Sequence, residues 1–212
     1  MKIVTLLAQK GGTGKSTLSI HLAVLAAAKK LKVLIADIDP QQSTTFWHQR
    51  RADKVPEVIP LDASSLKQSI ADMETSGVDL LVIDTAPHSR EETFIAAQLA
   101  DFILIPTRPA ILDLQAIGDS VKIVQNINGH AAIVLNACPF PGKNGERAIV
   151  SEAREALSGY GLPVAPVAIS NRVALSHSLI DGKSVTEFES DGKAADEIRE
   201  LMNWINQEAK LW

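Results

Sequence analysis

A glycine-rich loop between an apolar run and a helical pattern is the first stretch whose residue types could do chemistry. Residues 3–8 are apolar in the manner of a buried strand, and residues 18, 22, 25 and 26 repeat at helical spacing. Glycines let the loop curl so that its N–H groups, together with the helix N-terminus, bind an anion. We therefore predict a phosphate-binding loop whose nucleotide-binding residues are Gly11, Gly12, Thr13, Gly14, Lys15, Ser16 and Thr17.

Two side chains of this loop have specific expected roles, and two positions depart from the usual pattern. Lys15 is expected to reach the β- and γ-phosphates, and the Ser16 hydroxyl is expected to bind Mg²⁺. Gln9 stands where the first glycine is usual, and Lys10 adds a second lysine. Because the loop wraps the phosphates from the other side, we expect Lys10 to serve a nucleotide on a facing subunit. The alternative, a chance turn rich in glycine and lysine, fits the strand–loop–helix context poorly.

Carboxylates follow two further apolar runs, residues 32–37 and 79–84. Asp37 and Asp39 stand two residues apart in extended chain, so they point the same way, and Asp84 ends the second run. Open α/β sheets bind ligands at the carboxyl ends of their strands. A carboxylate there can orient an attacking water or hold Mg²⁺ through water during phosphoryl transfer. For Asp39 and its neighbours the alternative is a turn capped by aspartate side chains.

These motifs together resemble the deviant Walker A signature of ParA/MinD-type ATPases. The residues that carry the resemblance are the loop at 9–17, Asp37-Ile38-Asp39-Pro40-Gln41, Asp84-Thr85-Ala86-Pro87 and the stretch at 179–185. Within that group the chain is most similar to the short plasmid-partition ParA proteins such as ParF. The resemblance implies an ATPase that uses ATP and Mg²⁺, with Lys10, Lys15 and Asp39 as catalytic residues.

The resemblance also implies roles for individual residues at the strand ends. Asp39 would position the hydrolytic water, Asp37 would lie near the metal, and Asp84 would contact Mg²⁺ through water together with Ser16. Asn136, at the end of the run 131–136, would contact the adenine base, since an amide can both donate and accept; the alternative is a simple strand-end cap. His88 is either a contact of the switch loop or an exposed loop histidine.

Apolar runs alternate with helical patterns along the whole chain, at 3–8, 32–37, 58–59, 79–84, 102–106, 131–136 and 164–169 for the strands. This alternation predicts a doubly wound, mainly parallel α/β sheet flanked by helices, the P-loop NTPase fold. We expect one domain over residues 1–212, without an N-terminal helix-turn-helix domain, signal peptide or bilayer-spanning run. The single cysteine, Cys138, excludes an internal disulfide and suits a reducing cytosol.

The function that the resemblance implies is DNA segregation. An ATP-bound homodimer would bind DNA non-specifically, and a centromere-binding, ParB-like adaptor would stimulate hydrolysis on the nucleoid in the cytoplasm. The net charge is −4, so DNA contact needs a local basic patch, for which the candidates are Arg172, Lys183 and Lys193. The alternatives are ordinary solvated charges, or an Arg172 that caps a helix or pairs with a carboxylate.

Three other functions use the same ATPase. One is the positioning of a different cargo, such as a protein cluster, which sequence alone does not separate from plasmid segregation. A second is a MinD-like membrane-associated division-site regulator, which needs a basic amphipathic tail. The tail here, from Asp196, is acidic, and its apolar positions at 198, 201, 202 and 205 are better explained by packing on the sheet, so we expect no membrane partner. The third, a small-molecule synthetase, needs polar substrate groups that the sequence does not offer.

Overall fold

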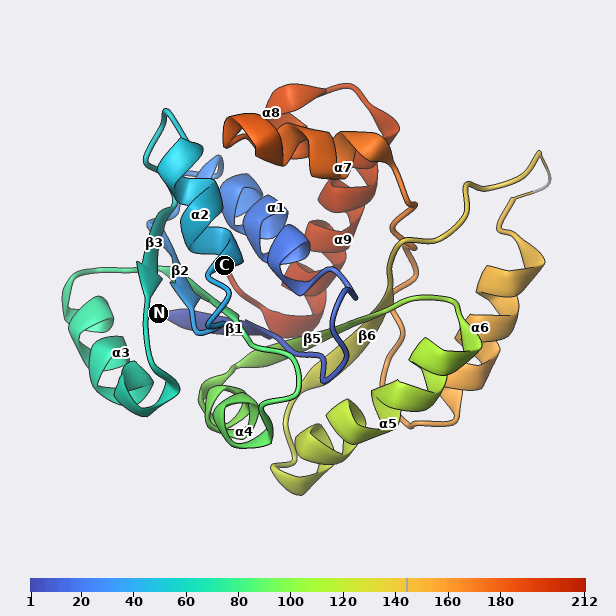
Figure 1. The fold of residues 1–212 in the computed structure, drawn as a ribbon, viewed down its shortest axis with the longest axis horizontal. Helices are drawn as coiled ribbons and strands as arrows, with labels where there is room; N and C mark the ends of the chain where they lie inside the picture. The colour runs from blue at the N-terminus through green and yellow to red at the C-terminus, as the bar shows by residue number, and fades with distance from the viewer. Residues whose placement is uncertain (144) are drawn as a thin grey trace.

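A parallel β-sheet forms the centre of the computed structural model, which describes residues 1–143 and 145–212 (Figure 1). Six strands lie in the order β3-β2-β4-β1-β5-β6, and every neighbouring pair is parallel. The predicted doubly wound α/β sheet is therefore confirmed. The strands are β1 (Lys2–Leu6), β2 (Val33–Asp37), β3 (Glu57–Pro60), β4 (Leu80–Asp84), β5 (Phe102–Thr107) and β6 (Ala131–Leu135).

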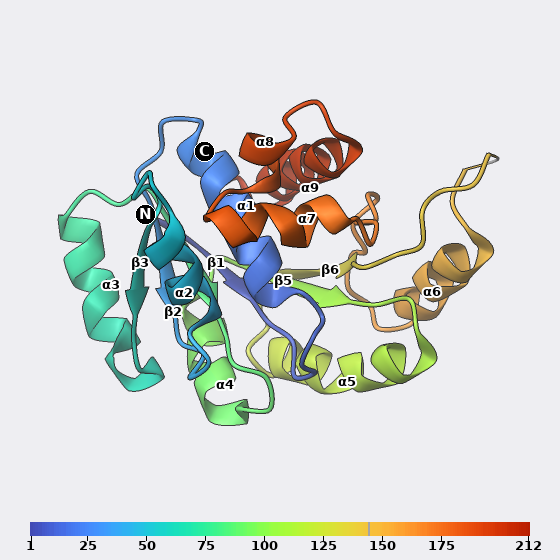
Figure 2. The ribbon, with the colours of Figure 1, turned by 45° about the horizontal axis from the view of Figure 1, so that its top comes forward.

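Helices cover both faces of this sheet, as Figures 1 and 2 show. One face carries α1, α2, α7, α8 and α9, and the other carries α3, α4, α5 and α6. Among the described residues, the 3₁₀ turn η1 (Ala63–Ser65) lies between β3 and α3, and the 3₁₀ turn η2 (Ser178–Asp181) lies between α7 and α8. The helices are α1 (Lys15–Ala27), α2 (Ser43–Arg50), α3 (Leu66–Thr75), α4 (Arg90–Leu99), α5 (Ile111–Asn126), α6 (Ala148–Ser158), α7 (Val173–His177), α8 (Val185–Phe188) and α9 (Lys193–Ala209).

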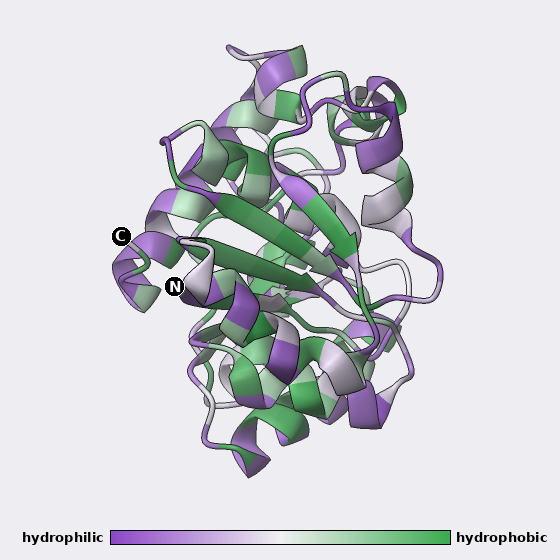
Figure 3. Cartoon of the chain, turned by 90° about the vertical axis from the view of Figure 1, so that its left-hand side faces the viewer, coloured by the Kyte–Doolittle hydropathy of each residue, from purple (hydrophilic) through white to green (hydrophobic). Residues whose placement is uncertain are grey.

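Strand residues alternate between the apolar cores on the two faces of the sheet because successive side chains point to opposite faces. Val4 and Leu6 of β1 pack on the side of α1 and α9, whereas Ile103 and Ile105 of β5 pack under α5 and α6. Figure 3 shows the strands largely green and the surrounding helices banded green and purple. Strands buried on both faces in this way explain the continuous apolar runs of the sequence.

The predicted strand at 164–169 is wrong as a regular element. The segment runs beside β6 but pairs with the neighbouring chain only through isolated bridges, Ile133 with Val164 and Cys138 with Ser170. Pro163 and Pro166 lack an N–H, so they cannot donate to a ladder. The chain therefore follows the edge of the sheet without becoming a seventh strand.

The predicted packing of the C-terminal helix is confirmed. All four apolar positions of its stripe, Ile198, Leu201, Met202 and Ile205, are buried in the core that contains α1. Over residues 1–143 and 145–212, we find no helix whose length and apolar character would let it cross a bilayer.

Candidate functional site

The glycine-rich loop connects β1 to α1, which begins at Lys15. Gly12 and Gly14 have φ angles of 73° and 96°, a backbone region that glycine enters without the steric cost of a side chain. The loop lines an open cavity of about 420 Å³ together with Asp39 and Gln41, which lie between β2 and α2, and with Trp47 and Arg50 of α2. Six of the eight predicted nucleotide-binding residues line this cavity: Gly11, Gly12, Gly14, Lys15, Ser16 and Thr17.

Lys15 is buried inside the site, with 6% of its surface exposed. Burial lowers the pKa of Lys15, while the negative charges of Asp84 and Asp39 raise it. A buried ammonium costs free energy unless it is paired, and a phosphate bound in this cavity would pair with it. This is the environment that a phosphate-binding lysine requires.

Asp84 lies at the centre of the carboxylate group, where the register of the sheet sets it opposite Asp37. Its Oδ1 accepts a hydrogen bond from Ser19 Oγ at 3.2 Å, whereas its buried Oδ2 has no partner among the described residues. Burial raises the pKa of Asp84 to about 7, an effect that the nearby Ser16 hydroxyl reduces. An orphaned, buried acceptor beside Ser16 fits the predicted Mg²⁺ site, where the ion would neutralise the phosphate charge.

Asp37 and Asp39 are used differently in the structure. Both oxygens of Asp37 accept hydrogen bonds: Oδ2 from the backbone N–H and hydroxyl of Thr45, each at 2.9 Å, and Oδ1 from the N–H of Asp39 at 3.3 Å. Asp37 therefore holds the start of α2, and its proximity to a metal stays a prediction. Asp39 accepts from the N–H of Gln41 at 2.9 Å and lines the cavity, as the water-positioning role requires.

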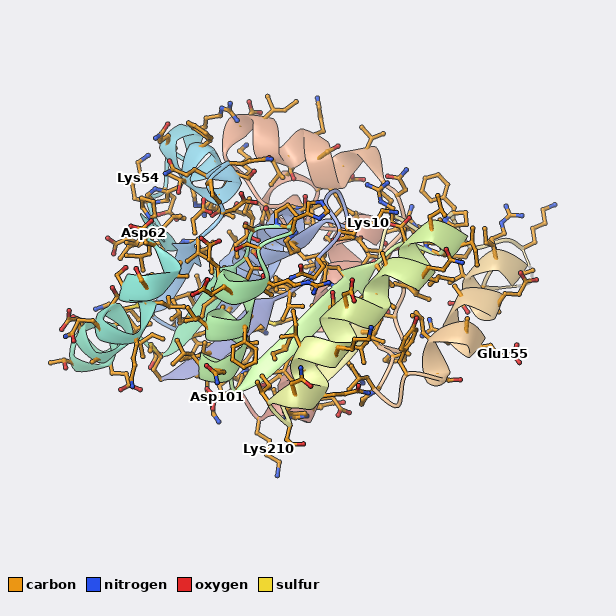
Figure 4. The ribbon with its side chains drawn as sticks, turned by 60° about the horizontal axis from the view of Figure 1, so that its bottom comes forward. Lys10, Lys54, Asp62, Asp101, Glu155 and Lys210 are labelled. Carbon is orange, nitrogen blue, oxygen red and sulfur yellow. The ribbon has the colours of Figure 1, made fainter. Side chains whose placement is uncertain are left out.

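Lys10 is bound within its own subunit. Its ammonium lies 2.9 Å from Oδ2 of Asp113, which stands in the first turn of α5 and has a side chain that is 9% exposed. Lys10 is labelled in Figure 4. The same segment contacts the loop again, since Ser120 Oγ accepts from the N–H of Gln9 at 3.1 Å. The expected contact of Lys10 with the nucleotide of a facing subunit stays a prediction. Such a contact requires Lys10 to leave Asp113.

Asn136 contacts the phosphate loop, because its Nδ2 donates to the carbonyl of Thr13 at 2.7 Å. Its expected contact with adenine stays a prediction. The side chain of His88 is exposed, as one of the two alternatives held, and its backbone N–H donates to the carbonyl of Gln9 at 3.1 Å. The loop is therefore held from two sides by segments that follow other strands.

The three residues proposed for DNA contact do not form one group of free cations. Arg172 donates to Glu197 Oε1 from Nε at 3.0 Å and from Nη2 at 2.9 Å, and its guanidinium stacks on Phe140. The structure thus shows for Arg172 the carboxylate pair that was its alternative, and this pair does not test contact with DNA. Lys183 and Lys193 are exposed.

Sequence reasoning missed the residues that support the loop from behind. Arg108, at the end of β5, donates to the carbonyl of Gly12, and Asp113 pairs with Lys10. Arg108 lies between β5 and α5, Asp113 lies in the first turn of α5, and neither position belongs to a sequence motif. Their only signal was position, because the carboxyl end of β5 lies next to that of β1 in the sheet.

Comparison with known proteins agrees with this geometry. A family model described as the CobQ/CobB/MinD/ParA nucleotide binding domain matches residues 4–185. The maintenance of carboxysome distribution protein A of Gloeobacter kilaueensis is 32% identical over 202 residues, which cover 92% of this chain and 88% of that protein. Protein ParA of Rhizobium radiobacter is 30% identical over 150 residues, 66% of each chain.

The fold is shared with solved structures at much lower identity. The chain of the MinC:MinD cell division protein complex of Aquifex aeolicus superposes with a TM-score of 0.79 at 15% identity, over 98% of this chain and 97% of that one. The sheet, the phosphate loop and the family model thus agree on one assignment. The chain belongs to the CobQ/CobB/MinD/ParA family of nucleotide-binding proteins and is an ATPase of the ParA/MinD type.

Proposed function

We propose that this ATPase positions an intracellular cargo, and that the cargo is a protein assembly. The observation that carries the proposal is the likeness to a carboxysome distribution protein over 92% of the chain, joined to a complete phosphate loop with Lys10 and Asp39. The expected special likeness to plasmid-partition proteins such as ParF is less well supported, since the match to Protein ParA covers 66% of the chain.

ATP would act as the switch of this cycle. The loop N–H groups and Lys15 would bind the phosphates, and Mg²⁺ at Ser16 and Asp84 would neutralise their charge. A second subunit would then close over the cavity, and Lys10 would exchange Asp113 for the partner's nucleotide. Asp39 would orient the water that attacks the γ-phosphate. Hydrolysis would then return the subunits to monomers.

The surface on which this ATPase positions its cargo would be DNA. Exposed lysines such as Lys183 and Lys193 would bind the DNA phosphates. A dimer doubles these charges on one body, so binding would require ATP through avidity. Contacts to phosphates are indifferent to sequence and weaken steeply with salt. An adaptor on the cargo would stimulate hydrolysis and release the dimer.

The experiment that tests this proposal has a biochemical and a cellular part. ATP, but not ADP, should convert the monomer to a dimer in light scattering and should increase binding to random-sequence duplex at low salt. In the host, deletion of the gene should cause copies of a protein assembly to cluster, while plasmids remain stably inherited. Absence of ATP-dependent DNA binding would refute the role of DNA as the positioning surface.

DNA segregation is the second candidate, favoured by the 30% identity to Protein ParA. It predicts the opposite cellular outcome, plasmid or chromosome loss with protein assemblies correctly placed. A MinD-like membrane role is less favoured, because the apolar face of α9 is buried in the core and unavailable to lipid. Sedimentation with anionic liposomes in the presence of ATP tests that role directly.

A further inference from the structure

Two side chains from adjacent strand ends bind successive carbonyls of the phosphate loop. The Arg108 guanidinium, after β5, donates to the carbonyl of Gly12, and Asn136 Nδ2, after β6, donates to the carbonyl of Thr13 at 2.7 Å. The two strand ends are themselves joined, because the N–H of Asn136 donates to the carbonyl of Thr107 at 2.7 Å. The pair is thus one unit, built on paired strands, that contacts the loop.

The contacts fix the direction of the loop's N–H groups. A peptide unit is planar and trans, so its carbonyl and the N–H of the next residue point in opposite directions. A Gly12 carbonyl held by Arg108 directs the N–H of Thr13 away from Arg108, and a Thr13 carbonyl held by Asn136 does the same for the N–H of Gly14. Anion binding requires successive N–H groups to converge.

We propose that Arg108 and Asn136 form a clamp that orients two peptides of the phosphate loop before the nucleotide arrives. Neither side chain is among those that line the cavity, whereas Gly12 and Gly14 are. Arg108 is therefore a positioning residue that acts through the loop backbone. Asn136 gains a role that does not depend on the adenine base.

The two glycines leave the space that the clamp occupies. A Cβ atom added at Gly12 would lie 2.9 Å from Nη2 of Arg108, and one added at Gly14 would overlap the amide of Asn136. Both glycines also have positive φ angles. Glycine at these positions thus serves the approach of the two side chains as well as the turn itself.

The clamp rests on nucleotide binding by this loop but is independent of the cargo. Its test measures binding of a fluorescent ADP analogue to the monomer, and displacement of that analogue by inorganic tripolyphosphate, which has no base. Arg108→Ala should weaken the binding of both ligands at least about tenfold, the loss expected for a hydrogen bond with a charged donor. Arg147→Ala is the matched control, since Arg147 is also exposed and donates to a backbone carbonyl, that of Phe140, at 3.0 Å.

Rescue and coupling separate the clamp from a general structural effect. Added guanidinium ion should restore ligand affinity to Arg108→Ala and leave Arg147→Ala unchanged. Gly12→Ala should weaken binding less in the Arg108→Ala background than in the wild type, because the added methyl group no longer meets a guanidinium; the cost of the positive φ is the same in both backgrounds and cancels. Additive effects would show that Arg108 does not act on Gly12.

Asn136→Ala should weaken the binding of tripolyphosphate as well as that of the ADP analogue. An effect on the ADP analogue alone would assign Asn136 to the base and remove it from the clamp. Unchanged affinities in Arg108→Ala, with the wild type binding normally, would overturn the clamp while leaving the nucleotide function intact. A wild type that binds neither ligand would overturn both.

Discussion

His21 makes the folded protein sensitive to acid. It lies in the middle of α1 with no exposed surface, and its ring joins α1 to α7 and α8. Figure 2 shows α7 crossing in front of α1. Nε2 lies 3.1 Å from the carbonyl of Leu175, and Nδ1 accepts from the N–H of Val185 at 3.2 Å. A neutral ring with its proton on Nε2 satisfies both contacts. A second proton on Nδ1 would face the N–H of Val185 and break one of them.

The size of the effect follows from the pKa of His21, which burial lowers from 6.5 to about 4. Above pH 6.5 the ring is neutral in both folded and unfolded chains, so its stabilising contribution is complete. Between pH 6.5 and pH 4 the unfolded chain binds the proton first, and the free energy of unfolding falls. The full loss is about 3 kcal/mol, from about 1.4 kcal/mol per pKa unit.

Urea unfolding of the nucleotide-free protein at pH 7.5, 5.5 and 4.5 measures this loss, with His21→Gln as the reference. Glutamine keeps a donor and an acceptor but does not titrate. Burial raises the pKa of Asp84 to about 7, which makes stability fall as pH rises and opposes His21 in the same window. That effect is common to both proteins and cancels in their difference. If the difference between wild type and variant is independent of pH, His21 is not the buried neutral residue described here.

The remaining predictions concern the site and its surroundings. Lys15→Gln should abolish ATP binding in an equilibrium titration, and retained affinity would contradict the phosphate role. Asp39→Ala should slow hydrolysis at least about tenfold while an ATP-bound dimer accumulates in light scattering, because water positioning acts on the transition state. Lys10→Ala should spare ADP binding but lower dimerisation, and it should also lower the melting temperature by leaving a buried carboxylate unpaired; a normal dimer would refute the cross-subunit role. Arg172→Ala should cost about 2 kcal/mol in urea unfolding, because Glu197 loses both hydrogen bonds from Arg172 and keeps only those from Ser170, and it should not change DNA affinity.

The sequence predicted the elements whose signal is local. The strand–loop–helix at Lys15 and the aspartates at the ends of β2 and β4 follow from residue type and from where parallel strands terminate. The segment at 164–169 had the same apolar composition as a strand but contains Pro166 and follows Pro163, and composition alone does not weigh the missing donors.

Contacts between distant segments could not be predicted in this way. Asp113 pairs with Lys10 across about a hundred residues of chain, and Arg172 finds Glu197 on another helix. An arginine that is exposed to solvent and an arginine that pairs with a carboxylate can stand in the same sequence pattern. Only the packing of α9 against the core decides between them.

The segment after α6 also has a consequence for assembly. β6 is an outer strand of the sheet, and its Ile133 and Leu135 carbonyls accept from the N–H groups of Ala165 and Ile169, while the N–H of Ile133 donates to Pro163. An open outer strand is a template on which another chain can add its own strand. Here the segment after α6 already occupies that template, so copies of this protein cannot extend one sheet into the next by pairing directly on β6.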